Sequence, residues 1–115
     1  MVIATEEVEE LIDSKGDYIL IDVRREDELA NGIIPTAKHL CLDEIEIAFE
    51  LSEEEFKERY GFDKPSKSDL IILYCRTGSR SGMAAMFLKS KGYNVKNYQG
   101  SVQAWSLIDD NVKMY

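Results

Sequence analysis

The six residues from Cys75 to Arg80, Cys-Arg-Thr-Gly-Ser-Arg, combine a nucleophile with groups that favour negative charge. The thiolate form of cysteine is the reactive nucleophile, and nearby positive charge lowers the pKa of the thiol. Arg76 and Arg80 supply two such charges, and Gly78 lets the backbone curl closely around the sulfur. The residue types therefore predict a reactive thiolate in a loop that binds anions through Arg76, Thr77, Gly78, Ser79 and Arg80.

Two strongly patterned segments enclose this loop. Leu70–Tyr74 is continuously apolar, which is typical of a strand buried on both faces, and Ser81–Lys91 is a predicted helix that ends at Gly92. Ligands of open α/β sheets bind beyond the carboxyl ends of the strands. We therefore expect Cys75 to face the N-terminus of the next helix, where backbone N–H groups and the helix dipole lower its pKa.

Strand and helix patterns alternate along the remainder of the chain. Thr5 is expected to cap a first helix, and Ser52 and Glu55 form a predicted capping box. The other predicted elements are strands at 18–21, 37–40 and 95–98, and helices at 25–31, 53–60 and 101–108. Trp105 and the methionines and phenylalanine of the 81–91 helix are expected in the core. The alternation predicts an α/β fold with a parallel sheet covered on both faces, in one domain over residues 1–115.

Composition excludes several classes of function. The net charge of −8 is split between −12 in residues 1–60 and +4 in residues 61–115, which disfavours nucleic acid as a partner. The two cysteines and single histidine give neither a disulfide framework nor an ordinary metal site. No segment is long and apolar enough to predict a membrane span, and the first residues do not resemble a signal peptide.

Other polar residues invite a catalytic role, but each has a simpler interpretation. Asp22 and Arg24 are expected to support the site structurally, by bonding loop backbone near it. His39 is expected to be a satisfied or surface histidine, and Cys41 an inert, half-buried cysteine rather than a resolving thiol. Cys75 itself, taken alone, would more often be a small core residue; its position among strand, glycine, arginines and helix favours a function.

Motifs along most of the chain resemble the rhodanese domain family, particularly its small single-domain thiosulfate sulfurtransferases. The similar segments are Ile21-Asp22-Val23-Arg24 with Glu28, Gly32-Ile33-Ile34-Pro35-Thr36-Ala37, Tyr74 to Ser81, Gly92-Tyr93, and Tyr98-Gln99-Gly100-Ser101 with Trp105. The chain departs from the family pattern at three positions. Ile33 replaces a common histidine, and Thr36 and Ser101 replace common glycines, so we expect altered turns there rather than an altered nucleophile.

The resemblance implies a rhodanese-like fold with a central parallel sheet of about five strands and helices on both faces. It also implies a sulfurtransferase that carries sulfane sulfur as a persulfide on Cys75, without a cofactor or metal. The expected partners are a small anionic sulfur donor and an acceptor that is cyanide or a thiol, including a thioredoxin-like or other protein thiol. A cytoplasmic location is expected, or a mitochondrial one if a transit peptide has been removed.

Two alternatives stay open at this point. One is a non-catalytic rhodanese-like module that binds a protein partner. The other is a phosphatase or arsenate reductase of the same fold. Those enzymes have one more residue between the cysteine and the arginine, so the spacing from Cys75 to Arg80 favours sulfur chemistry over phosphorus chemistry.

Overall fold

The computed structural model describes residues 2–115 and contains one parallel sheet of four strands in the order β2-β1-β3-β4. The strands are β1 (Ile19–Asp22), β2 (Lys38–His39), β3 (Leu70–Tyr74) and β4 (Asn94–Asn97). Val2 adds an isolated parallel bridge to Asn97, so the sheet is close to the expected five strands. β3 lies between β1 and β4 and pairs with both, which explains its uninterrupted apolar sequence.

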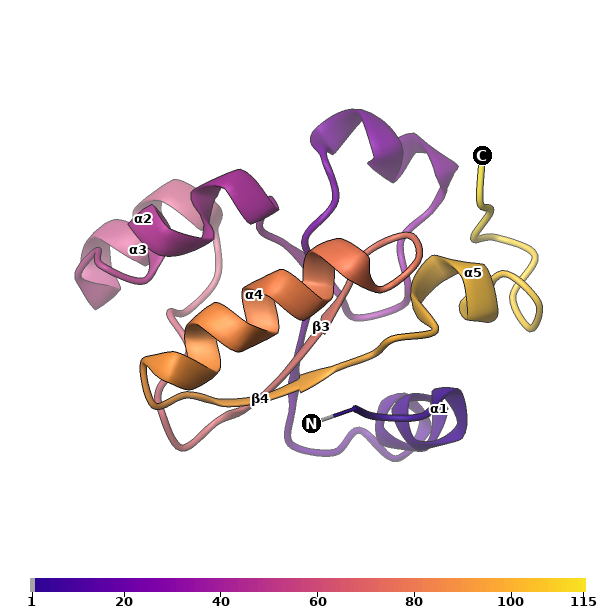
Figure 1. Cartoon of the computed structure of the whole chain (residues 1–115), viewed down its shortest axis with the longest axis horizontal. Coiled ribbons are helices and arrows are strands. Elements are labelled where there is room, and N and C mark those ends of the chain that lie inside the picture. Colours follow the sequence, from indigo (N-terminus) through magenta and orange to yellow (C-terminus); the bar gives the residue numbers. More distant parts are fainter. Residues whose placement is uncertain (1) are drawn as a thin grey trace.

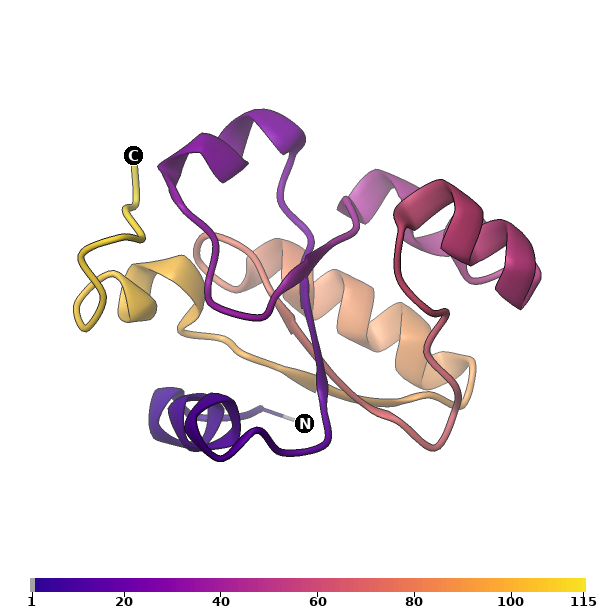
Figure 2. The same cartoon turned by 180° about the vertical axis from the view of Figure 1, so that it is seen from behind.

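Helices cover both faces of this sheet, as predicted (Figures 1 and 2). The α-helices are α1 (Thr5–Ser14), α2 (Ile45–Ala48), α3 (Glu53–Tyr60), α4 (Ser79–Ser90) and α5 (Ser101–Trp105); the 3-10 helices are η1 (Glu26–Asn31) and η2 (Leu42–Glu44). None of the helices in residues 2–115 has the length and apolar character needed to cross a membrane.

The alternating side chains of β3 divide the core into two halves. Ile71 and Leu73 pack on the face covered by α2, α3 and α4, whereas Ile72 and Tyr74 pack on the face covered by α1 and α5. Trp105 lies in the second half, as predicted. Because both halves are buried, β3 is held firmly from either side, and its carboxyl end presents Cys75 at a fixed position.

Several helix boundaries differ from the predictions. The capping box at Ser52 and Glu55 is confirmed, with both reciprocal hydrogen bonds formed. The N-cap of α1, however, is Ala4 rather than Thr5. The Thr5 hydroxyl instead forms a hydrogen bond with the hydroxyl of Tyr98, at 2.7 Å. The side chain predicted to cap the helix therefore makes a tertiary contact.

α4 corrects two further predictions. It starts at Ser79 rather than Ser81, and Met83 and Met86 are exposed on its outer face rather than packed in the core. The buried face is formed by the small Ser81 and Ala84 with Leu88. Met86 lies two residues beyond Ala84, a rotation of about 200° around the helix, and therefore points away from the sheet. The last helix is also shorter than predicted, because α5 ends at Trp105.

Candidate active site

The loop that follows β3 turns sharply into α4 at Gly78. Gly78 has φ of 98°, a left-handed conformation that residues with a side chain rarely adopt. A methyl group on its α-carbon would also run into the carbonyl oxygen of Gln99. The glycine is thus required twice, by the turn and by the close approach of the neighbouring loop.

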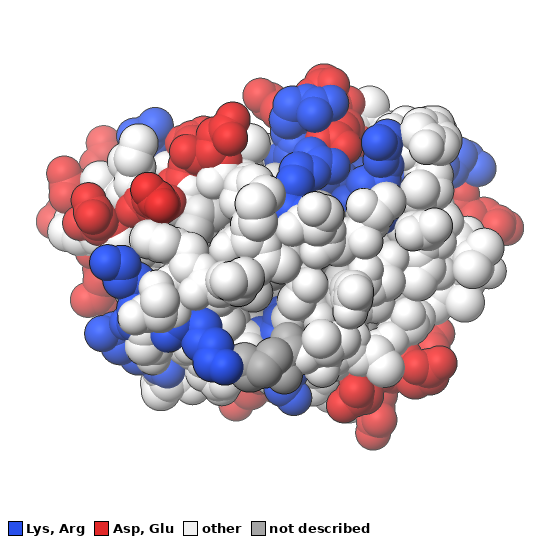
Figure 3. All heavy atoms as spheres, viewed as in Figure 1, with Lys and Arg blue, Asp and Glu red and all other residues white. Residues whose placement is uncertain are grey.

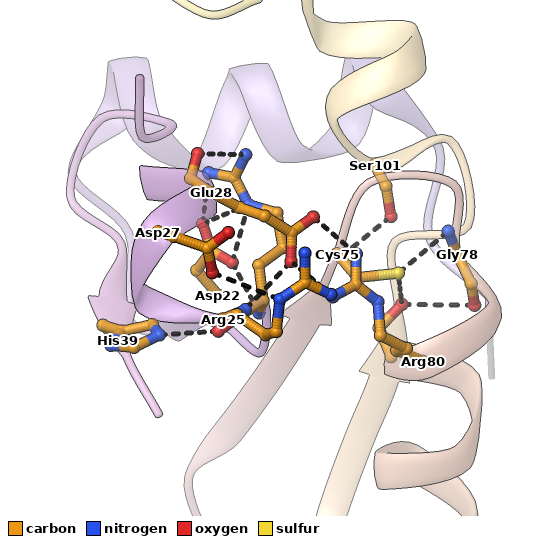
Figure 4. A network of polar contacts seen from close by, with 11 residues as sticks. Asp22, Arg25, Asp27, Glu28, His39, Cys75, Gly78, Arg80 and Ser101 are labelled. Carbon is orange, nitrogen blue, oxygen red and sulfur yellow. Dashed lines mark hydrogen bonds and ion pairs between the residues drawn. The ribbon is translucent and has the colours of Figure 1, made fainter. Parts of the chain in front are cut away.

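Cys75 is fully buried at the centre of this turn. Its Sγ accepts a hydrogen bond from the backbone N–H of Gly78 at 3.0 Å, as Figure 4 shows. Burial alone would raise the pKa of the thiol, but hydrogen bonds from the Ser81 hydroxyl and from the amides of Ser81, Gly78 and Thr77 outweigh it. The pKa of Cys75 therefore lies below its ordinary value, as predicted, although hydrogen bonds rather than the arginines are the main cause.

Ser81 connects the sulfur to a polar group on β4. Its Oγ lies 3.5 Å from Cys75 Sγ and 2.6 Å from the Oδ1 of Asn97, and both serine and cysteine are buried. The hydroxyl has a single proton, which it can donate to only one acceptor at a time. The sulfur, the Oδ1 of Asn97 and the carbonyl oxygen of Gly78, at 3.2 Å, therefore compete for this proton, and a thiolate at Cys75 is the charged acceptor among them.

The start of α5 fixes the backbone of the loop. The Oγ of Ser101 accepts from the N–H of Cys75 at 3.1 Å, and the N–H groups of Val102 and Gln103 donate to the carbonyls of Cys75 and Arg76 at 3.1 and 2.9 Å. Ser101 has φ of 52°, so this serine occupies a left-handed position of the kind that favours glycine. The hydrogen bond from the Cys75 amide to its hydroxyl offsets part of the strain of that conformation.

Arg80 does not project freely over the sulfur. Its two terminal nitrogens donate to the two carboxylate oxygens of Glu28, at 2.6 and 2.8 Å. The Nη1 of Arg25 forms a longer ion pair with the same carboxylate, 3.7 Å from its Oε1. Figure 4 shows both arginines directed toward Glu28 beside Cys75. The hydrogen bond from Arg80 lowers the pKa of Glu28 to about 2, so this carboxylate is ionised at any ordinary pH.

The other predicted loop residues are less enclosed. Arg76 lies over the ring of Tyr115, with its guanidinium carbon 4.8 Å from the ring centroid. Thr77 and Ser79 are exposed at the surface. Figure 3 shows lysine and arginine side chains gathered over the start of α4 and the preceding loop.

Asp22 and Arg24 form a fully buried ion pair, with 2.7 Å between Oδ2 and Nη2. Arg24 also donates to the backbone carbonyls of Glu28 and Gly32, at 3.3 and 2.8 Å. The pair thus holds the segment that carries Glu28, rather than the cysteine loop directly. His39 donates from Nε2 to the carbonyl of Arg24 at 2.7 Å and is therefore satisfied by backbone.

Outside the loop, residues 2–115 contain no second cluster of reactive side chains. Cys41 is half-buried, as expected. A hollow of about 920 Å³ is lined by residues that include the first residues of β1 and β2, Ile19 and Lys38, and neither a cysteine nor a histidine is among its lining residues. Among residues 2–115, no group of three or more His, Cys, Asp or Glu side chains is placed to hold a metal ion.

Four residues of the site were not identified from the sequence: Glu28, Ser81, Asn97 and Ser101. Glu28, Ser81 and Ser101 lie in segments that the sequence analysis did single out, but their roles could not be inferred from spacing. Glu28 meets Arg80 across 52 residues of chain, and Ser101 meets Cys75 across 26. Asn97 gives no sequence signal of its own.

The chain is similar to known proteins in both sequence and structure. Residues 4–107 match the sequence model of the Rhodanese-like domain. A Schizosaccharomyces pombe protein named "Putative thiosulfate sulfurtransferase, mitochondrial" is 47% identical over 89 residues, which are 76% of this chain and 63%, or less than two thirds, of that protein. The human thiosulfate:glutathione sulfurtransferase is 32% identical over 80% of this chain and 82% of its own length. The structure of a human single-domain sulfurtransferase superposes with a TM-score of 0.89 at 29% identity, over 94% of this chain and 96% of that one.

Proposed function

Because the chain belongs to the rhodanese family, we propose that it is a thiosulfate sulfurtransferase that carries sulfane sulfur on Cys75. The observation that carries this proposal is the hydrogen-bonded sulfur of Cys75 at the end of β3, with a pKa below that of an ordinary thiol. The names of the relatives support the same reaction. We further propose that residues 1–115 form one rhodanese domain.

The first half-reaction transfers sulfur to the protein. The Cys75 thiolate attacks the outer sulfur of thiosulfate and forms a new S–S bond, while the original S–S bond breaks and its electron pair leaves with sulfite. The products are a Cys75 persulfide anion and sulfite, so charge and atoms balance. The amide of Gly78 and the hydroxyl of Ser81, which already contact the sulfur, lie where they can stabilise the persulfide anion.

The second half-reaction returns the enzyme to its starting state. A nucleophile such as cyanide or a thiolate attacks the outer sulfur of the persulfide, and the Cys75 thiolate is the leaving group. A depressed pKa favours this step, because a more stable thiolate leaves more readily. A thiol acceptor is supported by the name of the human relative, a thiosulfate:glutathione sulfurtransferase. Glutathione or a protein thiol, including that of a thioredoxin-like protein, is therefore proposed as the acceptor.

The loop residues have different roles in this scheme. Gly78 shapes the turn and donates its amide to the sulfur, together with the amides of Thr77 and Ser81. Arg76, at the rim, and Arg80, held beside the sulfur by Glu28, attract the anionic donor. Asp22 and Arg24 support the site through the segment that carries Glu28.

The direct test is steady-state kinetics with thiosulfate and either cyanide or glutathione. The wild-type protein and Cys41→Ser should turn over at similar rates, because Cys41 is outside the loop. Cys75→Ser should lose activity with both acceptors. An aryl phosphate should not be hydrolysed. Phosphatase activity, or full sulfurtransferase activity of Cys75→Ser, would refute the proposed function.

The cytoplasmic location stays a prediction. The name of the S. pombe relative makes the mitochondrion the other compartment to examine by fractionation.

A further inference from the structure

A single carboxylate lies between two guanidinium groups beside the nucleophile. Glu28 accepts both terminal nitrogens of Arg80 and is 3.7 Å from Arg25. Its side chain is only 9% exposed, and that of Arg80 is 26% exposed. The pair is therefore shielded enough from water for the two charges to act strongly on each other and on any ion that enters the site.

Glu28 leaves one edge of Arg80 available. A guanidinium group has five N–H bonds, and Glu28 uses one on each terminal nitrogen of Arg80. Within residues 2–115, no hydrogen bond is formed by the Nε of Arg80. Arg80 can therefore hold Glu28 and contact a second anion together, but with its positive charge already compensated.

From this arrangement we infer that Glu28 determines substrate specificity: by neutralising Arg80, it limits how strongly the site attracts anionic sulfur donors and retains the sulfite that leaves. The inference rests on the proposed function. With Glu28 ionised, the Arg25–Glu28–Arg80 group has a net charge of +1; without that charge it would be +2. Thiosulfate and sulfite are dianions, so each would bind more tightly, and sulfite would leave more slowly.

The first test compares Glu28→Gln with two matched variants. Glu28→Gln removes the charge and keeps one oxygen that can accept from the Arg25 amide, as Glu28 Oε1 now does at 3.0 Å. Asp27→Asn removes the same charge from the neighbouring exposed residue, which pairs with Arg25 and not with Arg80. Glu28→Asp keeps the charge but shortens the side chain.

For Glu28→Gln, the KM for thiosulfate and the inhibition constant of sulfite should fall together, by about two- to tenfold, and kcat should not rise. The decrease should shrink as salt is added. Asp27→Asn should keep values close to those of the wild type, and Glu28→Asp, which keeps the charge, should lower both constants less than Glu28→Gln does. If Glu28→Asp changes these constants as Glu28→Gln does, the length of the side chain matters rather than its charge, and the inference is wrong.

The second test does not depend on sulfur transfer. In a Cys41→Ser background, Cys75 can be alkylated by iodoacetate, which is anionic, or by iodoacetamide, which is neutral and of nearly the same size. Glu28→Gln should raise the ratio of the two rate constants several-fold, and Asp27→Asn should leave it unchanged. An unchanged ratio in folded Glu28→Gln would overturn the inference even if the protein is a sulfurtransferase. A raised ratio in a protein that does not use thiosulfate would instead overturn the proposed function.

Discussion

Ser81 is the residue whose contacts account most directly for a thiolate at Cys75. The sulfur is buried, and burial by itself favours the neutral thiol. Its hydrogen bonds come from the Ser81 hydroxyl and from backbone amides, and they reverse that preference. Backbone amides are not removed by substituting a side chain. The Ser81 hydroxyl is therefore the hydrogen-bond donor to the sulfur that a mutation can delete.

Ser81→Ala should raise the pKa of Cys75. A thiol reacts as the thiolate, so the alkylation rate rises with pH through the pKa, and that midpoint should move to higher pH in the variant. The rate at pH values below the midpoint should fall accordingly. Ser79→Ala, which changes an exposed serine of the same loop, is the control and should keep the wild-type profile. A midpoint that stays in place in Ser81→Ala would contradict the account of the lowered pKa.

The two arginines of the loop should differ in importance. Arg80 is fixed next to the sulfur by Glu28, whereas Arg76 lies at the rim against Tyr115. Arg80→Ala should therefore reduce kcat/KM for thiosulfate more than Arg76→Ala, by about 1–3 kcal/mol in transition-state stabilisation. Arg80→Lys should recover only part of the loss, because a lysine cannot reproduce the planar fork. Steady-state kinetics decide this, and equal losses for the two alanine variants would refute it.

At the scale of elements, the sequence was most informative where local pattern and tertiary environment agree. The apolar run of β3 and the Ser52–Glu55 capping box were predicted correctly, since burial and capping chemistry are local properties. Met83 and Met86 were misplaced, because apolar residues at helical spacing do not reveal which face the sheet covers. Glu28 and Ser101 were missed as site residues because their partners are distant in sequence, and only the fold brings them together.

Gly78→Ala tests the turn between β3 and α4. The substitution strains a left-handed backbone and places a methyl group against Gln99, so it should destabilise the protein by about 1–3 kcal/mol and abolish most activity. Gly61→Ala is a matched control, since Gly61 also has a positive φ, of 81°, but nothing lies within 4 Å of the added methyl group. It should cost about 1 kcal/mol and leave kcat unchanged. Urea denaturation and kinetics on both variants check this; equal losses of activity would contradict it.

At the scale of the whole molecule, the buried pair of Asp22 and Arg24 ties the sheet to the segment that carries Glu28. Both side chains are inaccessible to water, so a change in either one leaves an uncompensated charge. The active site therefore depends on an interaction that also holds the fold together.

Asp22→Asn should lower the free energy of unfolding by about 3–5 kcal/mol, because Arg24 stays buried without its counter-charge. Asp63→Asn removes a partner from the exposed pair Lys57–Asp63 and should cost less than about 1 kcal/mol. Both values can be measured by urea denaturation at neutral pH. A similar, small cost for the two substitutions would show that the buried pair contributes little to the fold.

The central claim, that Cys75 carries sulfur, is tested most directly by intact-mass spectrometry with site mapping after incubation with thiosulfate. The protein should gain the mass of one sulfur atom, the added sulfur should map to Cys75, and cyanide should remove it. Cys41→Ser should gain the same mass and Cys75→Ser should gain none. Sulfur mapped to Cys41, or no gain in mass by the wild-type protein, would contradict the account.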